Sequence, residues 1–440
     1  MIKTFGPVDD RSLKQLETCM EAGDAEFGVL CADHHPGYSQ PIGGAIGFEG
    51  FVSPSGVGFD IGCGNKAVRT NLTRADLDVE GAMGEIVRRV SFGMGVPAQE
   101  KTDHPVIERI AQAPFAPQRK LLDLARNQLG TVGSGNHYVN LFADEDGTVW
   151  IGVHFGSRGF GHKTATGFLA LAQGLPFDEG ERKRMGLKVA EGEMDSPPVL
   201  FAIDSEVGQS YVEAMQVAGE YAYAGRDVVV DKVLEILGAE AMHEVHNHHN
   251  FAWLEEHFGR RLWVVRKGCT PANAGQEGFV GGSMGDESVI LEGVESGDAS
   301  SAESLYSTVH GAGRVMSRSA AAGRMKRSTV YACSVRDCSF EVPAREYKGQ
   351  ACPRHPEASM RKVRREELKR AGLVDWPAVQ QRLRGEGIVV MGGGADEAPE
   401  VYKRLPDVLA AHGDTIRVKH RLTPLGVAMA GRDVFDPYKD

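Results

Sequence analysis

The sequence has no long apolar run, few cysteines and no excess of positive charge, and each absence excludes a class of protein. No stretch of the 440 residues approaches the roughly 18 consecutive apolar residues that a transmembrane helix requires. The opening residues, MIKTFGPVDD, lack the basic and then apolar pattern of a secretory signal peptide. The seven cysteines are odd in number and scattered, which is typical of reduced thiols and metal ligands rather than of a disulfide framework. We therefore expect a cytoplasmic protein that does not contact a membrane.

The formal net charge of −11 argues against a broad surface that coats nucleic acid, although it is compatible with a local basic groove. With 42% hydrophobic residues, the chain can build a large core. Its 55 glycines indicate many turns and close approaches of the backbone, as enzymes that handle phosphate groups need.

The order of the expected helices and strands favours one large α+β unit. Amphipathic patterns predict helices near residues 75–93, 116–128 and 205–236, and WIGVHF at 150–155 predicts a short buried strand. The histidine-rich segment at 244–259 is expected to lead into a helix. Because helices and strands alternate without a regular βα period, a doubly wound parallel sheet is not expected. We therefore predict an α+β fold of mixed sheets with surrounding helices.

A shift in composition divides the chain. Residues 328–390 are charged, arginine-rich and contain cysteine, whereas the segments on either side have the composition of an ordered core. We expect a core in two parts, residues 1–327 and 391–440, with 328–390 as an inserted basic lobe. The sequence contains no internal repeat and no low-complexity tract.

The stretch GVGFDIGCGNKAVRT, residues 56–70, places Asp60 close to Cys63 in a segment too rich in glycine for a helix. Alone, this pattern is more often a tight turn with a buried cysteine than a functional site. A carboxylate and a thiolate on a tight backbone can also bind cations together, and one thiolate can bridge two divalent ions. The other donors in the chain decide between these two interpretations.

Four histidines each stand beside glycine, serine or asparagine at an expected strand end or turn. Any one of them is more often structural than a ligand, but with Asp60 and Cys63 they supply the donors that two metal ions sharing a thiolate need. Imidazole and carboxylate suit manganese or zinc, and glycine-rich turns offer backbone N–H groups to phosphate oxygens. The sequence therefore predicts a di-metal enzyme of phosphoryl transfer. The histidines are His137, His154, His249 and His310, and the turns lie at 130–136, 155–161, 275–285 and 311–313.

Six motifs extend this interpretation. They are DIGCGN, GSGNH, VHFGSRGFGH, HHNFAWLEEH, RKGCTPA with GGSMGDESVI, and HGAGRVMSR. Together they resemble the RtcB family of RNA-splicing ligases. The matches occur in the order of the family, from about Asp33 to the C-terminus, and only residues 328–390 interrupt them.

The resemblance implies a reaction that joins an RNA end carrying a 3′-phosphate or 2′,3′-cyclic phosphate to a 5′-hydroxyl end, with GTP and two Mn²⁺. His310 would accept GMP and pass it to the 3′-phosphate, because a neutral imidazole nitrogen can attack a phosphorus whose charge a metal neutralises. Cys63 would bridge both metals. His154 and His249 would complete one metal site, and Asp60 and His137 the other.

The resemblance also assigns residues to the nucleotide and to the RNA. Tyr138 would stack on the purine, and the two asparagines beside ligand histidines would contact phosphate or orient the imidazole rings. Two arginines would clamp the terminal phosphate of the RNA, where a planar guanidinium suits the oxygens. The nucleotide residues are Asn136, Tyr138, Asn140, Asn250, Ser283, Gly313 and Met429, and the arginines are Arg158 and Arg314.

Two positions depart from the family where the guanine would be recognised. Asn140 replaces a glutamate that accepts hydrogen bonds from guanine, and Met429 replaces a lysine. The loss of both charges predicts a relaxed or altered base preference that admits ATP. The alternative is that Lys439 or Arg432 folds back and replaces the missing lysine.

The insertion carries a pattern of its own. Cys333 and Cys338 form C-x4-C, and Cys352 and His355 form C-x2-H, which together predict a structural Zn²⁺ that staples a small lobe. Free thiols are the alternative. The basic run at 361–370 is either a solvated surface or an electrostatic handle for RNA.

Two other functions are compatible with the same residues. One is a di-metal phosphatase or cyclic phosphodiesterase that processes RNA ends, and the other is a non-catalytic protein that binds RNA ends. The resemblance further implies a monomer and an archease-like activator. Asp33 is expected to support the site or the RNA, or else to pack, while Lys403 is expected to be structural, Cys269 to be a small buried residue and His248 to have no assigned task.

Overall fold

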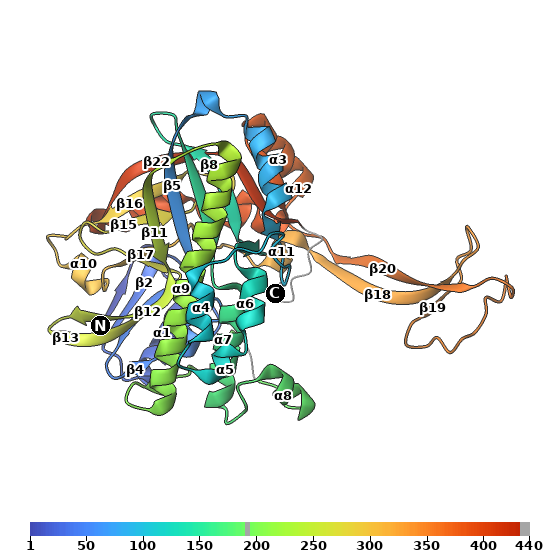
Figure 1. The fold of residues 1–440 in the computed structure, drawn as a ribbon, viewed down its shortest axis with the longest axis horizontal. Helices are drawn as coiled ribbons and strands as arrows, with labels where there is room; N and C mark the ends of the chain where they lie inside the picture. The colour runs from blue at the N-terminus through green and yellow to red at the C-terminus, as the bar shows by residue number, and fades with distance from the viewer. Residues whose placement is uncertain (190–193, 432–440) are drawn as a thin grey trace.

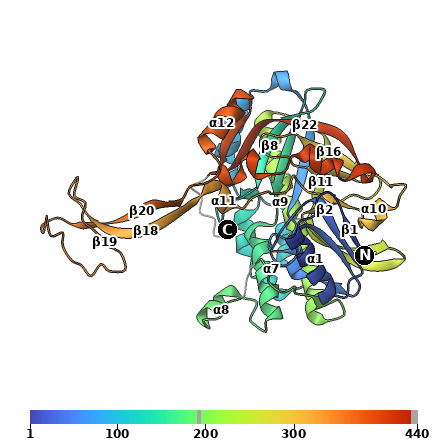
Figure 2. The same cartoon turned by 180° about the vertical axis from the view of Figure 1, so that it is seen from behind.

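The computed structural model describes residues 1–189 and 194–431, and these form an α+β body from which a thin arm projects (Figures 1 and 2). The α+β fold predicted from the sequence is confirmed. The larger sheet is eight-stranded, with the order β11-β5-β9-β8-β22-β16-β15 and with β21 parallel to β22. Its strands are β5 (Gly64–Thr73), β8 (Tyr138–Ala143), β9 (Thr148–Phe155), β11 (Ala241–His248), β15 (Glu277–Val280), β16 (Ser288–Gly293), β21 (Val389–Gly393) and β22 (Ile416–Gly431).

The smaller sheet of the body is five-stranded, with the order β1-β2-β3-β13-β12. Its strands are β1 (Ile2–Thr4), β2 (Phe27–His35), β3 (Ile42–Phe48), β12 (Asn250–His257) and β13 (Arg260–Lys267). Three further strand pairs join β4 (Phe51–Val52) to β10 (Phe201–Ala202), β6 (Ser91–Phe92) to β7 (Thr131–Gly133), and β14 (Cys269–Pro271) to β17 (Ser307–Val309). A single residue, His249, separates β11 of the larger sheet from β12 of the smaller one.

The prediction that the histidine-rich segment at 244–259 leads into a helix is wrong, because this segment forms strands β11 and β12. The pair β12–β13 is closed by a two-residue turn in which Phe258 and Gly259 both have positive φ, +54° and +72°. Such a turn matches the twist of two antiparallel strands and fixes their register. The hairpin therefore overrides the helix-forming residues of WLEEH.

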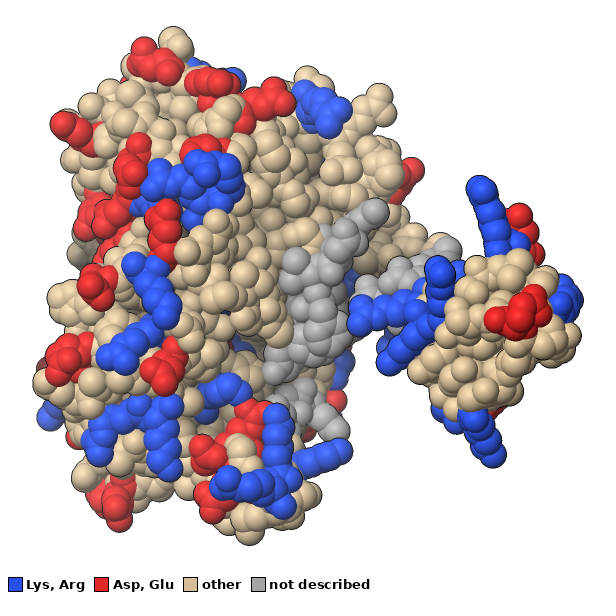
Figure 3. Space-filling model, turned by 45° about the vertical axis from the view of Figure 1, so that its right-hand side comes forward, with Lys and Arg blue, Asp and Glu red and all other residues tan. Residues whose placement is uncertain are grey.

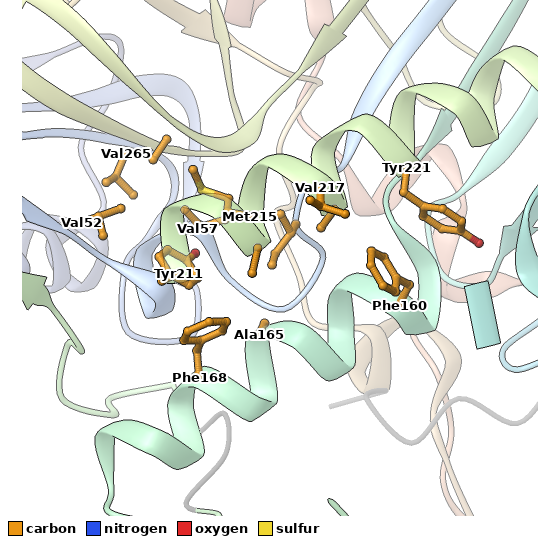
Figure 4. Close-up of a cluster of buried hydrophobic side chains, with 14 of the residues drawn as sticks. Val52, Val57, Phe160, Ala165, Phe168, Tyr211, Met215, Val217, Tyr221 and Val265 are labelled. Atoms are coloured by element: carbon orange, nitrogen blue, oxygen red, sulfur yellow. The ribbon is translucent and has the colours of Figure 1, made fainter. Parts of the chain in front are cut away.

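The long helix α9 (Glu206–Leu237) lies within one residue of the prediction and crosses the body (Figure 1). Its aromatic side chains pack on α7 (Arg158–Ala172): Phe168 meets Tyr211 and Phe160 meets Tyr221, with ring centroids 5.2 and 5.1 Å apart (Figure 4). These rings are fully buried or nearly so. The contact fixes α7, which begins at the cavity described below, against the core.

The other two predicted helices are shorter than expected. The first is α3 (Val79–Arg89), which begins at the Asp78 cap, and the second is divided into α5 (Ala116–Arg119) and α6 (Leu122–Gln128). The remaining helices are α1 (Asp10–Ala22), α2 (Pro54–Val57), α4 (Pro105–Ala111), α8 (Glu179–Arg184), α10 (Ser300–Glu303), α11 (Arg318–Ala322), α12 (Trp376–Gly385) and α13 (Leu405–Ala410), with short 3-10 turns η1 (Arg74–Asp76), η2 (Ala395–Glu397), η3 (Pro399–Val401) and η4 (Gly413–Thr415). In the described part of the chain, no helix has the length and apolar character needed to cross a bilayer.

The arm comprises residues 324–370 and is a three-stranded sheet of β18 (Arg324–Cys333), β19 (Glu341–Pro343) and β20 (Met360–Arg370). After the arm, α12 returns to the body, where Trp376, Val379 and Leu383 pack with Met429. The domain boundaries expected from composition stay a prediction.

Candidate functional site

A cavity of about 970 Å³ opens beside the larger sheet, and the donors predicted from the sequence gather in it. Each donor lies at a strand end or in the turn that leads to one. Asp60 and Cys63 precede β5, and His249 joins the two sheets. The six side chains that reach the cavity are Asp60, Cys63, His137, His154, His249 and His310.

Cys63 stands at the centre of two donor clusters. Its Sγ lies 3.7 Å from Nε2 of both His137 and His154, and His137 Nε2 lies 3.1 Å from an Asp60 oxygen. The donor atoms of Cys63, His154 and His249 all lie within 4.8 Å of one another, as do those of Asp60, Cys63 and His137. These separations resemble the ~3.5–3.8 Å edges of a tetrahedron around a metal bound to sulfur and nitrogen. The arrangement can hold two divalent ions that share the thiolate.

The electrostatics of the clusters fit cations. Burial, followed by the charges of neighbouring histidines, lowers the pKa of His154 and His249 well below the usual range, so both rings are neutral as ligation requires. Burial alone would raise the pKa of Asp60, but the hydrogen bond and charge of His137 outweigh it and keep the carboxylate ionised. Burial and the Asp60 charge raise the pKa of Cys63, which a bound cation would offset. Among the described residues, the buried Nε2 of His249 has no hydrogen-bond partner.

The far nitrogen of each histidine ligand is held by a defined acceptor. His137 Nδ1 lies 3.0 Å from the Val132 carbonyl oxygen, and His154 Nδ1 contacts Asn65 Oδ1. His249 Nδ1 lies 3.2 Å from Asn250 Oδ1. With the Nδ1 proton of His154 and of His249 held in this way, the Nε2 lone pair of each ring faces the cluster.

The turn that carries Cys63 is fixed by backbone bonds and by a buried arginine. Gly62, with φ of +69°, donates from its N–H to the Asn250 carbonyl at 2.8 Å, and His249 N donates to the Cys63 carbonyl at 2.8 Å. Arg226 of α9 is fully buried and donates to the Gly62 carbonyl at 2.9 Å. Its Nη2 also lies 2.9 Å from His248 Nδ1, so His248 supports this arginine and does not face the metal clusters.

His310 follows β17 and is oriented by Asp33. Its Nδ1 lies 2.7 Å from Asp33 Oδ2, an ion-pair distance, and the same oxygen accepts hydrogen bonds from the backbone N–H of His310 at 3.1 Å and of Gly311 at 3.3 Å. Asp33 is fully buried. Burial alone would raise the pKa of its carboxyl group, but the charge and hydrogen bonds of His310 outweigh burial and lower that pKa below its ordinary value. An ionised Asp33 therefore holds the ring so that Nε2 is free to react in the cavity.

The predicted nucleotide residues line the same cavity. Tyr138 and Met429 are partners across β8 and β22, and Met429 packs with Met284 and Trp376. Asn140 Oδ1 is buried and has no hydrogen-bond partner among the described residues. The seven residues that reach the cavity are Asn136, Tyr138, Asn140, Asn250, Ser283, Gly313 and Met429. These residues bring the Tyr138 ring and three side-chain amides, those of Asn136, Asn140 and Asn250, to one cavity. The proposed substitutes Arg432 and Lys439 lie outside the described residues.

The two predicted phosphate arginines differ in their surroundings. Arg158 begins α7 with φ of +54° and places Nη1 2.9 Å from His137 Nδ1, close to the donor clusters. Arg314 also lines the cavity, but Nη2 donates to the Asp396 carbonyl at 2.8 Å and Nη1 lies 3.4 Å from Glu397. Arg158 is therefore placed for a ligand, whereas Arg314 must exchange a protein partner for one.

Lys267 is a cavity residue that the sequence argument did not assign, although it lies in the RKGCTPA motif. It is buried, and Nζ donates to the Tyr38 carbonyl at 2.5 Å, with the Ser55 carbonyl at 3.4 Å. Burial lowers its pKa to about 8. The lysine ties the segments around Tyr38 and Ser55 to β13 and places an ionisable amine in the cavity.

The titration of Lys267 predicts a pH-dependent stability. Because its folded pKa of about 8 lies below the ordinary value, folding favours loss of the proton, and the free energy of unfolding rises between about pH 8 and pH 10. Lys267→Met removes this contribution, so its stability relative to wild type should fall by about 2–3 kcal/mol over that range. Urea unfolding at several pH values measures it. Lys14→Met, at an exposed position of helix α1, is the control for loss of a charge. Equal pH profiles for wild type and Lys267→Met would contradict the prediction.

Comparison with known proteins identifies the family of this chain. A family model described as tRNA-splicing ligase RtcB matches residues 25–120 and 107–351, well over half of the chain. The chain belongs to the RtcB family. The expected resemblance is thus confirmed.

Individual RtcB proteins match over most of their length. The tRNA-splicing ligase RtcB of Archaeoglobus fulgidus is 29% identical, over 91% of this chain and 87% of its own. That of Thermococcus kodakarensis is 28% identical, over 95% and 91%. The RNA-splicing ligase RtcB of Escherichia coli K12 is 33% identical, over 67% and 75%.

Several residues that support the site of this RtcB protein were not predicted from its sequence. Asn65 was detectable, since it ends the DIGCGN motif and directly contacts His154. Arg226 lies in a long helix far along the chain from Gly62, and no local pattern signals their contact. Glu397 pairs with both Arg314 and Arg318 at the cavity wall and likewise has no signature. Lys403 is structural, as expected, because Nζ donates to the Ala32 and His34 carbonyls at 2.9 and 3.0 Å.

Proposed function

We propose that this RtcB-family chain is an RNA ligase that joins a 3′-phosphate or 2′,3′-cyclic phosphate end to a 5′-hydroxyl end, with GTP and two Mn²⁺. The observation that carries the proposal is the placing of His310, oriented by Asp33, in one cavity with two donor clusters that share Cys63. The His249 and His310 rings lie 4.7 Å apart, so a phosphate at His310 would also reach the metal clusters. A histidine with a purely structural role would need neither the Asp33 carboxylate nor the adjacent donor clusters.

The residues support a nucleotide transfer in which the bonds balance. His310 Nε2 attacks the α-phosphorus of GTP, a P–N bond forms, and pyrophosphate leaves. A 2′,3′-cyclic phosphate is first opened by water, which breaks the P–O2′ bond, protonates the 2′ oxygen and leaves a 3′-phosphate. An oxygen of the RNA 3′-phosphate then attacks the phosphorus bound to His310, and the P–N bond breaks. The 5′-hydroxyl oxygen next attacks the activated 3′-phosphorus, loses its proton and releases GMP. Divalent ions held by the two clusters would neutralise phosphate charge in these steps.

Each neighbouring residue would have a defined task in this scheme. Asp33 holds the proton on His310 Nδ1, so Nε2 presents its lone pair to phosphorus. Arg158, beside His137, is placed to bind the terminal phosphate. Arg314 would do so after release from Glu397. Asn136 and Asn250 line the cavity beside their histidines and would bind phosphate or hold the rings.

End joining with defined RNA substrates tests the proposal. The purified chain with Mn²⁺ and GTP should join a 3′-phosphate end to a 5′-hydroxyl end and should fail when the 3′ end is a hydroxyl. Release of inorganic phosphate without joining would favour the end-processing phosphatase, and binding without chemistry would favour the end-binding protein. The resemblance further predicts a monomer, which light scattering measures, and activation by an archease-like protein, which would raise repeated turnover without changing the products.

The predicted nucleotide residues support a second proposal, that the chain discriminates weakly between guanine and adenine. Asn140 offers an amide, which can both donate and accept, and Met429 carries no charge, so these two positions supply neither the acid nor the cation that would reject adenine. Stacking on Tyr138 is available to either purine.

These two positions predict labelling of the protein by both α-labelled GTP and α-labelled ATP, with rates within roughly tenfold of each other. Asn140→Glu with Met429→Lys should restore the charges and favour GTP by roughly 100-fold or more, because unmatched buried polar groups penalise adenine. Asn140→Gln with Met429→Leu is the matched control and should keep the wild-type ratio. Strict GTP specificity in the wild type would contradict the proposal.

A further inference from the structure

A second donor cluster lies at the tip of the arm, away from the cavity. Cys333 Sγ and Cys352 Sγ lie 3.6 and 3.8 Å from His355 Nδ1, and Cys338 Sγ lies 3.7 Å from Cys352 Sγ. All four donor atoms lie within 4.8 Å of one another. Sulfur atoms in a disulfide are only ~2.05 Å apart, whereas the edges of a tetrahedral zinc site with three thiolates and one imidazole are ~3.5–3.8 Å. The spacing is that of a metal site.

The tip has little else to hold it together. Among the described residues, the five hydrophobic clusters of the protein contain no side chain from the arm. Between β18 and β20 the chain contains only the three-residue strand β19 and turns, in which Cys338 N donates to the Val335 carbonyl and His355 N to the Cys352 carbonyl. A lobe without an apolar core needs a metal or disulfide to fold. The cluster supplies that constraint.

The arm is positively charged in a negatively charged protein. Residues 324–370 contain 13 Lys and Arg and six Asp and Glu, while the whole chain has a net charge of −11. Figure 3 shows Lys and Arg side chains extending from the arm, with fewer acidic ones between them. The surplus is therefore a local basic surface and not a general property of the protein.

One face of the arm combines free cations with aromatic rings. Lys362 and Arg364 of β20 share a face with Tyr331 of β18, because strand residues two apart point the same way and Lys362 pairs with Tyr331. Tyr331 stacks on Tyr347 with centroids 3.8 Å apart. Lys362 and Arg364 are exposed, and neither forms an ion pair with any described residue. On the opposite face, Arg365 pairs with Glu341.

The base of the arm is joined to the cavity wall. Arg318, at the start of α11, lines the cavity, and α11 leads directly into β18. On the return, Leu373 N and Val374 N donate to the Ala320 and Ala321 carbonyls at 3.0 and 3.2 Å. A strand of RNA that leaves the cavity past α11 would therefore meet the arm.

We propose that the arm is an RNA-docking element whose tip is folded around one Zn²⁺ and whose Lys362–Arg364 face binds the phosphate backbone away from the reacting end. The inference rests on the proposed RNA ligase activity for the identity of its ligand. Cations beside half-buried aromatic rings suit RNA, since phosphates bind to the cations and unpaired bases stack on the rings. The arm adds affinity for RNA and takes no part in nucleotide transfer to His310.

Metal analysis of the full chain tests the site. Cys338→Ser with Cys352→Ser should lower zinc content by one ion per chain and remove the visible absorption of a tetrahedral thiolate site after cobalt substitution. The single variant His355→Ala should weaken cobalt binding at the tip even if the double variant fails to fold. Cys19→Ala, which removes a buried thiol of the body, should change neither. Unchanged zinc and cobalt binding in both arm variants would overturn the metal assignment.

Salt-dependent RNA binding tests the surface. Lys362→Glu with Arg364→Glu should weaken binding of an RNA with a 3′-phosphate by roughly tenfold near 0.1 M salt and reduce the slope of log K against log salt by about 2. Lys14→Glu with Arg74→Glu, an equal charge change on exposed residues of the body, should have little effect. Labelling of His310 by GTP should be unchanged in both variants. Loss of labelling would therefore contradict the proposed ligase activity and not the role of the arm. Equal RNA binding by wild type and the arm variant would overturn the proposal and would favour an acidic protein as the ligand of this face.

Discussion

Replacing His310 with alanine is expected to abolish transfer of a nucleotide to the protein and to slow end joining by roughly a thousandfold or more, because the proposed reaction loses its nucleophile. The side chain is mostly buried in the cavity, with Nδ1 bound to Asp33 and Nε2 free. Incubation with Mn²⁺ and α-labelled GTP, followed by a count of acid-labile label on the protein, measures the first step. Binding of Mn²⁺ and the melting temperature should be close to wild type.

Asp33→Asn separates orientation from reactivity at the same histidine. The amide keeps the size of the side chain but loses the charge that His310 and the backbone N–H groups face, so labelling should slow by roughly 10–100-fold without being abolished. The KM for GTP should remain near wild type, which a loss of cavity structure would not allow. A His310→Ala protein that still carries acid-labile label would contradict the assignment of the nucleophile.

Replacing Cys63 with alanine should remove both metal ions, because its thiolate belongs to both donor clusters. We expect Mn²⁺ affinity at each site to fall by roughly 100-fold and joining by at least as much, since every step requires neutralised phosphate. Asp60→Asn and His249→Ala should each weaken one site and spare the other. Equilibrium dialysis counts the ions, and electron paramagnetic resonance detects the magnetic coupling of two Mn²⁺ that share a ligand.

Cys31 provides a matched control for loss of a buried thiol. Cys31 is buried, its Sγ lies 3.7 Å from that of Cys269, and neither cysteine belongs to the two donor clusters. Cys31→Ala should therefore leave two coupled Mn²⁺ and most of the activity. If Cys63→Ala also kept two coupled ions, the shared-thiolate arrangement would be wrong.

Local patterns in the sequence were sufficient for some elements of the fold. The long helix α9 is capped at its start by Ser205, whose side chain accepts from Gly208 N, and after its end by Gly238 in the left-handed region, so both of its ends have local signals. The segment at 244–259 misled because its charged and aromatic residues suit a helix, whereas the Phe258–Gly259 turn and pairing with β13 decide for a strand. Tertiary pairing of this kind has no local signature.

The candidate site divides in the same way. Its donors were predictable because each stands beside glycine, serine or asparagine in a motif, as with His137 in GSGNH. The residues that hold those donors were not, because their roles are defined by contacts between distant segments. Arg226 reaches Gly62 across 164 positions, and Asp33 reaches the His310 backbone across 277. Such residues become visible only when the strands and α9 are brought together.

The most direct test of the account follows one labelled nucleotide from the protein to RNA. The chain is incubated with Mn²⁺ and α-labelled GTP, freed of unbound nucleotide, digested and sequenced by mass spectrometry, while a second sample is chased with unlabelled RNA ends. We expect GMP on His310. When unlabelled RNA ends are added, we expect loss of that label together with formation of joined RNA. Label on another residue, or joined RNA from a protein that never carries a nucleotide, would contradict this expectation.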